Sequence, residues 1–253
     1  MRYYLLFLVL FASLFFSQLA SSQEANVQFE QANQLYRSGD YQKASQSYEQ
    51  IVSTGIENTF LYYNLGNSYY KLKEYPSAIL NYERAKRLTP NDEEIEHNLH
   101  LANLRVVDKI EPVPQLFILE WWKMFVNLFS SDGWGWLAIS FLWGSALCGI
   151  LLLLLRIDIL RRVLLLLSTL TLFLSILGFV GMAQRHSIEN EQYAIVFAQS
   201  VSIKSAPDAQ STDLFVIHEG VKAQILDTVG EWKKIKLLDG KIGWMQVSGL
   251  QII

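Results

Sequence analysis

Polar and aromatic side chains recur 34 positions apart in the first third of this 253-residue chain. The recurring pairs are Asn33 and Asn67, Tyr36 and Tyr70, Arg37 and Lys71, and Phe29 and Tyr63. An asparagine amide can hydrogen-bond a peptide backbone, an aromatic ring supplies contact area, and a basic group attracts carboxylates. This combination predicts a surface that binds an extended protein segment.

Motifs for catalysis and for metal binding are weak by comparison. Glu94, His97 and His100 form a Glu-x-x-His pair with a second histidine one turn on. A di-metal site of that kind needs a further pair and glutamates from neighbouring helices, which the sequence does not supply. It also lacks a glycine-rich phosphate loop and a Gly-x-Ser-x-Gly motif. We therefore expect a non-enzymatic protein with no catalytic residues, no metal and no cofactor.

The 34-residue period is typical of tetratricopeptide repeats, which are helix–turn–helix units. The copies span residues 25–58 and 59–92, and a partial third copy spans residues 93–107. The helix of this partial copy would close the end of the repeat module, residues 25–107, with a polar outer face. The second copy resembles the family pattern closely, through Leu65, Gly66, Tyr69, Ala78, Tyr82, Ala85 and Pro90. Small residues at Gly66 and Ala78 would let the paired helices touch.

The resemblance implies where the binding surface lies, because the first helix of each repeat lines a concave groove in this family. The implied groove residues are Phe29, Asn33, Tyr36, Arg37, Tyr63, Asn64, Asn67, Tyr70 and Lys71. The alternative is that these side chains are solvated or hold the repeats together. Packing by itself gives no evident reason to repeat an asparagine and a base, so we favour binding. We then expect loss of the Asn33 and Asn67 amides to weaken binding without lowering stability.

The N-terminal residues 1–22 have the pattern of a secretory signal peptide. Arg2 gives a positive start, Tyr3–Phe16 is apolar, and Ala20 and Ser22 are small residues before a cut at Gln23. The alternative is an uncleaved membrane anchor. Fourteen apolar residues are short for a membrane span, so we expect cleavage.

Residues 134–155 and 163–183 contain no Asp, Glu, Lys or Arg and are predicted to cross a membrane as a helical hairpin. The turn over residues 156–162 carries Arg156, Arg161 and Arg162. Positive residues in short loops stay in the cytoplasm. Together with the signal peptide, this pattern predicts a two-pass membrane protein with a cytoplasmic turn and with both soluble parts extracytoplasmic.

Two further features belong to the membrane region. A row of small residues, Ser168, Thr171, Ser175 and Gly178, permits close packing, either within the hairpin or with a partner's membrane helix. Residues 115–131 are aromatic and apolar, and they predict a juxtamembrane helix at the headgroup level. The alternative for that helix is packing against the outer soluble part.

From residue 190 to 253 the period changes to two, with glycine turns at intervals of about ten residues, which predicts a small β barrel. The segments VSIKSAP, EGVKAQIL and EWKKIKLLDGKIGW resemble a bacterial SH3-like domain. Some members of that family bind cell-wall peptides. Trp232 and Trp244 are candidates for a ligand-facing surface, and the alternative places both in the barrel core.

The predicted fold class is therefore a multidomain membrane protein with an all-α repeat module, two transmembrane helices and an all-β SH3-like barrel. The formal net charge of −3 gives no electrostatic footprint for nucleic acid. The whole order resembles the BatE-type proteins of the Bacteroides aerotolerance operon. That resemblance implies a bacterial cytoplasmic (inner) membrane with both soluble parts periplasmic. It also implies an adaptor in a stress-related envelope complex, with von Willebrand A-type membrane proteins as partners and, indirectly, a MoxR-type ATPase. The alternative function is a peptidoglycan-binding anchor.

Overall fold

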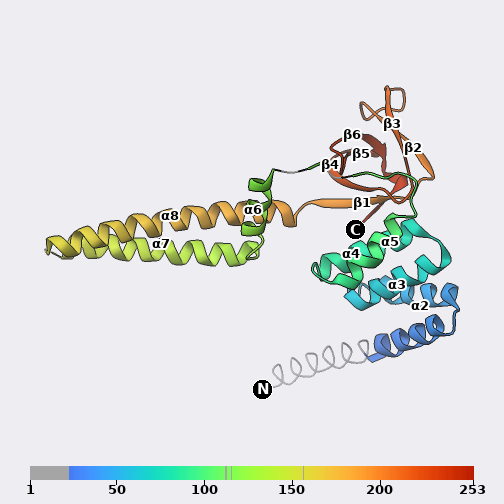
Figure 1. Ribbon diagram of the computed structural model, residues 1–253, viewed down its shortest axis with the longest axis horizontal. Coiled ribbons are helices and arrows are strands. Elements are labelled where there is room, and N and C mark those ends of the chain that lie inside the picture. The colour runs from blue at the N-terminus through green and yellow to red at the C-terminus, as the bar shows by residue number, and fades with distance from the viewer. Residues whose placement is uncertain (1–22, 112, 115, 156) are drawn as a thin grey trace, which may run out of the picture. The chain divides into compact units, whose positions relative to one another are not determined.

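The computed structural model describes residues 23–111, 113–114, 116–155 and 157–253, which form two compact units (Figure 1). The first unit joins the chain before residue 113 to Gln192–Ile253, and the second is Val113–Glu191. The predicted signal peptide, residues 1–22, lies outside the described residues. Helices in the N-terminal part, two long apolar helices and a C-terminal antiparallel sheet confirm the predicted fold class.

The N-terminal part is a series of antiparallel helices. Residues 23–37 are helical, and four more helices follow: α2 (Tyr41–Ser53), α3 (Thr59–Leu72), α4 (Tyr75–Leu88) and α5 (Glu93–Asn103). Side chains of Asp40, Asn58 and Asp92 accept backbone N–H bonds at the starts of α2, α3 and α5, as N-caps do. Two helices per period, and α5 after them, are the arrangement that the repeat pattern predicts.

Close packing between α3 and α4 explains the small residue at position 66. A Cβ added at Gly66 would lie 2.7 Å from the Tyr82 ring and 3.3 Å from the Ala78 carbonyl oxygen. Tyr82 is 1% exposed, so its ring fills the space that Gly66 leaves open. The predicted contact of Gly66 and Ala78 is therefore confirmed.

The C-terminal part is one seven-stranded antiparallel sheet with the order β3-β2-β6-β5-β4-β1-β7. Its strands are β1 (Gln192–Val196), β2 (Ser200–Lys204), β3 (Asp213–His218), β4 (Lys222–Val229), β5 (Trp232–Leu237), β6 (Ile242–Gln246) and β7 (Leu250–Ile252). The turns at Gly220 and Gly240 have φ of +88° and +87°, values that glycine adopts without strain. Alternate residues of β5 and β6, among them Ile235, Leu237 and Met245, form the core.

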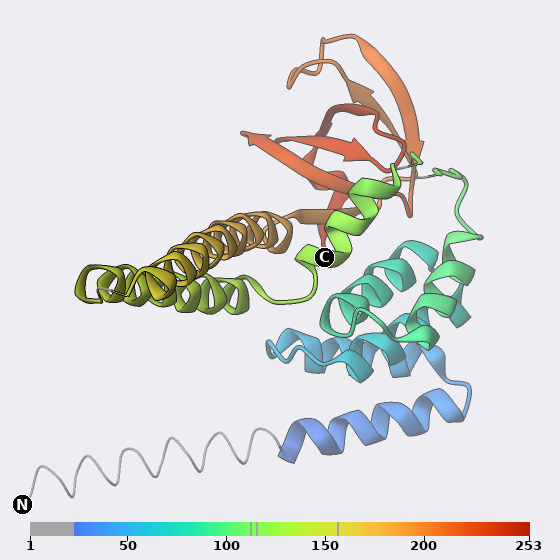
Figure 2. The same ribbon diagram turned by 60° about the vertical axis from the view of Figure 1, so that its left-hand side comes forward.

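Figure 2 shows the C-terminal strands next to the repeat helices, and side chains from the two parts form one hydrophobic cluster. Ile195 of β1 is fully buried in the cluster that contains Ala78, Ile79 and Tyr82. Polar contacts extend the junction: Lys222 pairs with Glu83 at 2.7 Å, and the His218 backbone N–H donates to Asp108 at 2.6 Å. The two soluble parts are consequently one folded unit, although they lie at opposite ends of the sequence.

The second unit contains α6 (Phe117–Val126), α7 (Ser131–Leu154) and α8 (Asp158–Glu189). The long helices α7 and α8 pack as a hairpin, and both are long and apolar enough to cross a membrane. The turn is shorter than the predicted residues 156–162, because α8 begins at Asp158. A negative residue in the first turn of a helix is favourable next to the positive end of its dipole.

Candidate functional site

The candidate site is a groove on the first helices of the repeats. Its pocket has a volume of about 320 Å³ and is formed by residues 23–37, α3, α4 and α5. Five predicted residues line it, namely Tyr36, Tyr63, Asn67, Tyr70 and Lys71. Tyr82, Asn98 and Leu101 complete the lining. The structure therefore brings together residues from both copies and from the partial third copy.

The floor of the groove is a ladder of hydrogen bonds centred on Asn67. Its Oδ1 accepts from the Tyr82 hydroxyl at 2.7 Å and from Asn98 Nδ2 at 3.0 Å. Asn98 Nδ2 also donates to the Tyr63 hydroxyl at 2.8 Å. One asparagine thus ties helix α3 to the second helix of its own repeat and to the first helix of the next copy.

The first repeat contains the same ladder. Asn33 Oδ1 accepts from the Tyr48 hydroxyl at 2.6 Å and from Asn64 Nδ2 at 3.0 Å. These partners lie 15 and 31 positions further along the chain, as they do for Asn67. The inference that packing offers no reason to repeat the asparagine is therefore wrong. Asn33, Asn64 and Asn67 join the helices, and the expectation that removing Asn33 and Asn67 leaves stability unchanged is corrected.

The repeated aromatic residues also make repeated contacts. Phe29 packs on Tyr48 and Tyr63 packs on Tyr82, with ring centroids 5.8 and 6.0 Å apart. Tyr36 meets Tyr41, and Tyr70 meets Tyr75, in edge-on pairs at 5.2 and 5.7 Å. These rings are held in place by the fold, so they would offer a bound segment a surface that loses little conformational entropy.

The electrostatics of the groove separate a neutral floor from a basic rim. Burial raises the pKa of Tyr36 and of Tyr63, and it raises the pKa of Tyr48 to about 12, so these hydroxyls stay protonated at neutral pH. Lys71 is exposed and lines the groove, whereas Arg37 is exposed but does not line it. The rim can attract carboxylates, while the floor offers rings and hydroxyls to a peptide.

Reasoning from sequence missed three lining residues, Tyr82, Asn98 and Leu101. Tyr82 was assigned to the packing alone, and it serves both roles because its ring fills the space beside Gly66 while its hydroxyl reaches Asn67. Asn98 carried a detectable signal, since it lies 34 positions after Asn64. No repeated residue in the sequence marks Leu101, because only the packing of α5 against α3 brings it to the pocket.

The second predicted surface lies on the barrel. Trp232 and Trp244 are half-buried and alternate with the core residues Ile235 and Met245, so they lie on the outer face of β5 and β6. Lys234 lies opposite Trp244 in the strand register, and its Nζ is 5.9 Å from the centre of that ring. The alternative that placed both tryptophans in the core does not describe this arrangement.

The row of small residues on α8 packs against α7. Ser175 Oγ donates to the Ala138 carbonyl at 2.9 Å, and Ser145 and Ser168 exchange hydrogen bonds with each other's carbonyl groups. A Cβ added at Gly178 would lie 2.9 Å from Ala138 Cβ. The row therefore serves contact within the hairpin, one of the two alternatives from the sequence.

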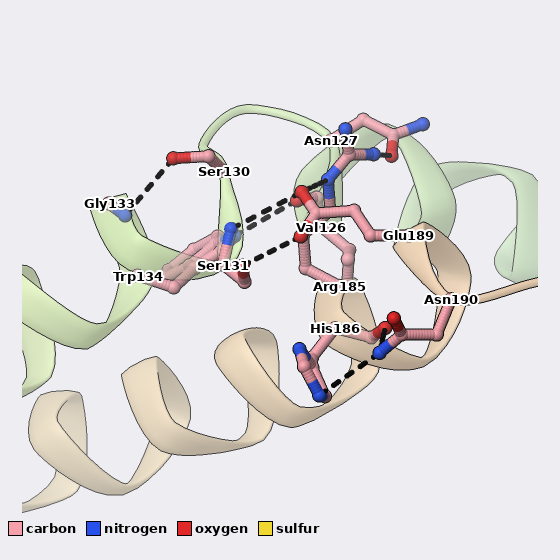
Figure 3. Close-up of polar contacts among 10 residues, drawn as sticks. All are labelled: Val126, Asn127, Ser130, Ser131, Gly133, Trp134, Arg185, His186, Glu189 and Asn190. Carbon is pink, nitrogen blue, oxygen red and sulfur yellow. Dashed lines mark hydrogen bonds and ion pairs between the residues drawn. The ribbon is translucent and has the colours of Figure 1, made fainter. Parts of the chain in front are cut away.

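Polar residues form hydrogen bonds at the end of the hairpin that contains the start of α7 and the end of α8 (Figure 3). Ser131 Oγ donates to Glu189 at 2.6 Å, and Arg185 Nε donates to the same carboxylate at 2.9 Å. Arg185 also donates to the Asn127 side chain in the segment after α6. These bonds hold the start of α7 beside the end of α8, so both connections to the first unit leave from one end of the hairpin.

The helix α6 is anchored through Trp134 at the start of α7. Trp134 Nε1 donates to the Val126 carbonyl at 2.9 Å, and the rings of Phe125 and Phe129 pack on the indole. Five other apolar side chains of α6 are exposed, namely Phe117, Ile118, Leu119, Trp121 and Met124, and Trp122 is half-buried. Residue 115, at the start of the predicted juxtamembrane helix, lies outside the described residues.

The predicted topology residues are placed only in part. Arg161 and Arg162 are exposed in the first two turns of α8. Arg156 lies outside the described residues. Among the residues that the structure describes, no three His, Cys, Asp or Glu side chains gather in a group that could hold a metal ion.

Two parts of the chain match known families. Residues 60–92 match the tetratricopeptide repeat family, and residues 199–251 match the bacterial SH3 domain family. No curated protein matches the chain. Tetratricopeptide repeats and SH3 domains are typically non-catalytic interaction modules, and a bacterial SH3 domain is compatible with binding to the cell wall. The chain thus combines a part similar to tetratricopeptide repeats, two apolar helices long enough to cross a membrane, and an antiparallel sheet similar to a bacterial SH3 domain.

Proposed function

We propose that this chain is a non-enzymatic, membrane-anchored adaptor that holds protein partners at the extracytoplasmic face of a bacterial cytoplasmic membrane. Its groove would bind an extended segment of a partner. The resemblance to BatE-type proteins suggests von Willebrand A-type membrane proteins as these partners, with a MoxR-type ATPase reached through them, in an aerotolerance or stress-related envelope complex.

The observation that carries this proposal is the groove itself. Rings from two repeats line a pocket of about 320 Å³, and Lys71 stands at its rim. The asparagine ladder holds the floor rigid, which lowers the entropy lost on binding. Tyr36, Tyr70, Arg37 and Lys71 make no contact in the ladder, so their side chains are the better candidates for contact with a partner.

The membrane anchor supports the same proposal. Only 17% of the most apolar 18-residue stretch of α7, and likewise of α8, is buried within the chain. The exposed apolar side chains would be covered by lipid if the helices cross a membrane. The repeat helices and the C-terminal sheet share a core and the hairpin is inserted between them in the sequence, which supports a placement of both on one side of the membrane. The signal-peptide pattern and the arginines at the hairpin turn favour the extracytoplasmic side.

A crosslinking experiment tests the groove. A photo-reactive amino acid replaces Lys71 at the rim, or Gln46 on the exposed face of α2 as the matched control. In living cells the Lys71 position should crosslink to a von Willebrand A-type membrane protein, and the Gln46 position should not. Adding Tyr70→Ala should weaken the adduct severalfold, and equal adducts from both positions would contradict the groove.

Cysteine labelling tests the orientation in the membrane. Cys148 is replaced by Ala, and single cysteines are placed at Gln46, Gln210 or Ile159, all of which are exposed. An impermeant thiol reagent should label Gln46→Cys and Gln210→Cys in cells whose outer barrier has been made permeable. It should label Ile159→Cys only after the cytoplasmic membrane is opened, and the reverse pattern would invert the topology.

The outer face of the barrel favours one alternative function, a peptidoglycan-binding anchor. Trp232 and Trp244 present aromatic surface on neighbouring strands, with Lys234 beside Trp244. If this face binds the cell wall, the full chain in nanodiscs should co-sediment with purified peptidoglycan, and Trp232→Ala with Trp244→Ala should abolish the co-sedimentation. Equal sedimentation of parent and variant would exclude the face.

A further inference from the structure

A second pocket, here called the α4 pocket, lies on the side of α3 away from the groove. Leu65 and Tyr69 line it, whereas Tyr63, Asn67 and Tyr70 line the groove, and helical periodicity places these two sets on opposite faces. The α4 pocket has a volume of about 260 Å³. Its walls come from α2, α3 and α4 together with Phe197 and Gln251 of the barrel.

Asn81 of α4 lines this pocket and carries a buried acceptor. The residue is 3% exposed, and its Nδ2 donates to the Ser77 carbonyl at 2.8 Å. That bond fixes the orientation of the Asn81 amide. If the amide were reversed, its oxygen would face the Ser77 carbonyl oxygen, and two acceptors cannot hydrogen-bond to each other. Within the described part of the chain, Asn81 Oδ1 has no hydrogen-bond partner. Buried acceptors without a partner are rare in folded proteins, so the oxygen suits an N–H from outside the chain.

Arg84 supplies a donor one helical turn from this acceptor. Residues three apart on a helix are neighbours on one face, so Asn81 and Arg84 present an acceptor and a donor side by side. The guanidinium donates to the Ile252 carbonyl at 3.1 Å and lies 5.7 Å from the centre of the Tyr62 ring, contacts that hold it in place. A guanidinium has five N–H donors, which leaves capacity for a further acceptor.

The apolar residues that line the α4 pocket limit the size and the polarity of a side chain that it can bind. Leu65 and Leu80 are buried apolar side chains, and Val52 and Phe197 are half-buried beside them. They form a surface for one small apolar side chain. The volume of about 260 Å³ lies below the range of roughly 300–1,000 Å³ usual for small-molecule sites, which favours a short stretch of a longer chain.

From this geometry we propose that the α4 pocket binds one residue of an extended, uncharged peptide segment. The backbone N–H of the segment donates to Asn81 Oδ1, its carbonyl accepts from Arg84, and its small apolar side chain packs on Leu65 and Leu80. The site is distinct from the groove and does not depend on it. Because Phe197 and Gln251 belong to the barrel, the bound peptide also bridges the two soluble parts.

The test titrates the full chain in lipid nanodiscs with N-acetylvaline methylamide, which carries two amide N–H groups and a small apolar side chain. The matched probe is the same compound methylated on both nitrogens, which has no N–H donor. The readout is the side-chain amide resonances of ¹⁵N-asparagine, with Asn81 assigned by its loss in Asn81→Leu. The first probe should shift the Asn81 resonance saturably, with a dissociation constant on the order of 1 mM.

Loss of the N–H donor should weaken binding roughly tenfold, the effect expected for a hydrogen bond to a buried acceptor. Asn81→Leu should have a melting temperature equal to or above that of the parent, because it removes an acceptor without a partner. Tyr70→Ala, a change in the groove, should leave the titration unchanged, which separates this site from the groove. Equal binding of both probes, or no saturable shift, would overturn the proposal.

Discussion

At the scale of single residues, Asn33 and Asn67 illustrate how one repeated side chain can be explained in two ways. Each presents an amide on the face of a first helix, where the repeat family binds peptides. Each also accepts hydrogen bonds from a tyrosine and from a second asparagine. The hydrogen bonds account for the repetition by themselves, so the argument for binding rests on Tyr36, Tyr70, Arg37 and Lys71.

Asn67→Ala should therefore destabilise the repeats. The change leaves the buried Tyr82 hydroxyl without its acceptor and removes one of the two acceptors of the Asn98 amide, and a buried group left without a partner costs about 1–3 kcal/mol. Urea denaturation of the full chain in nanodiscs, followed by circular dichroism, measures the loss. Lys71→Ala, at an exposed position of the same helix, should change the free energy of unfolding by no more than about 0.5 kcal/mol. Similar effects of the two substitutions would refute the ladder.

Tyr48 should make stability fall at alkaline pH. Burial is the main cause that raises its pKa from 10.0 to about 12 in the folded chain. The folded state thus favours the neutral phenol, so this stabilisation is complete below pH 10 and is lost as the pH rises through 12. Melting temperatures between these values should fall less steeply in Tyr48→Phe than in the parent. Parallel slopes would show that Tyr48 does not titrate in this way.

At the scale of helices and strands, the hairpin shows why small residues recur on α8. Lipid tails are as apolar as leucine side chains, so two membrane helices associate through close packing and hydrogen bonds. Ser168, Ser175 and Gly178 provide both against α7. Burial of this row leaves the larger side chains, such as Leu165 and Phe173, on the outside.

Gly178→Leu should disrupt the hairpin. Even a Cβ at this position would lie 3.0 Å or less from Ala138 Cβ and Cα, and overpacking costs about 1–3 kcal/mol or more. Gly149→Leu is the matched control, because a Cβ at Gly149 meets nothing within 4 Å. Unfolding in mixed detergent micelles, followed by tryptophan fluorescence, should begin at a lower denaturant fraction for Gly178→Leu only. Coincident curves for the two variants would mean that α7 and α8 do not pack through this row.

At the scale of the whole chain, the hairpin is an insertion in one folded unit. Strand β1 follows α8 directly in the sequence and packs on α4, more than a hundred residues earlier. The ion pair of Lys222 with Glu83 and the contact of His218 with Asp108 lie in the same junction.

Ile195→Ala should weaken both soluble parts together. Ile195 is fully buried among residues of α4, and removing such a side chain typically costs about 2–5 kcal/mol. Hydrogen exchange of the full chain in nanodiscs should show lower protection in α4 and in β1 alike. Ile242→Ala, at an exposed position of β6, should change neither. A loss confined to the barrel would show that the two parts fold independently.

The sequence by itself determined the parts of this protein that depend on local periodicity. A 34-residue period, two long runs without charge, and a change to period two predict repeats, a hairpin and a barrel, because apolar side chains must lie on one face of each element. The same periodicity identified Tyr36, Tyr63, Asn67, Tyr70 and Lys71, which the structure brings to one pocket.

Only the tertiary structure decided what those side chains contact. The role of Asn33 and Asn67 depends on partners 15 and 31 positions away, and the outward direction of Trp232 and Trp244 depends on strand register. The shared core of α4 and β1 and the buried Asn81 acceptor depend on segments that are distant in sequence. Spacing along a chain specifies which face of an element a residue occupies, whereas the partner across that face is set by how the elements pack.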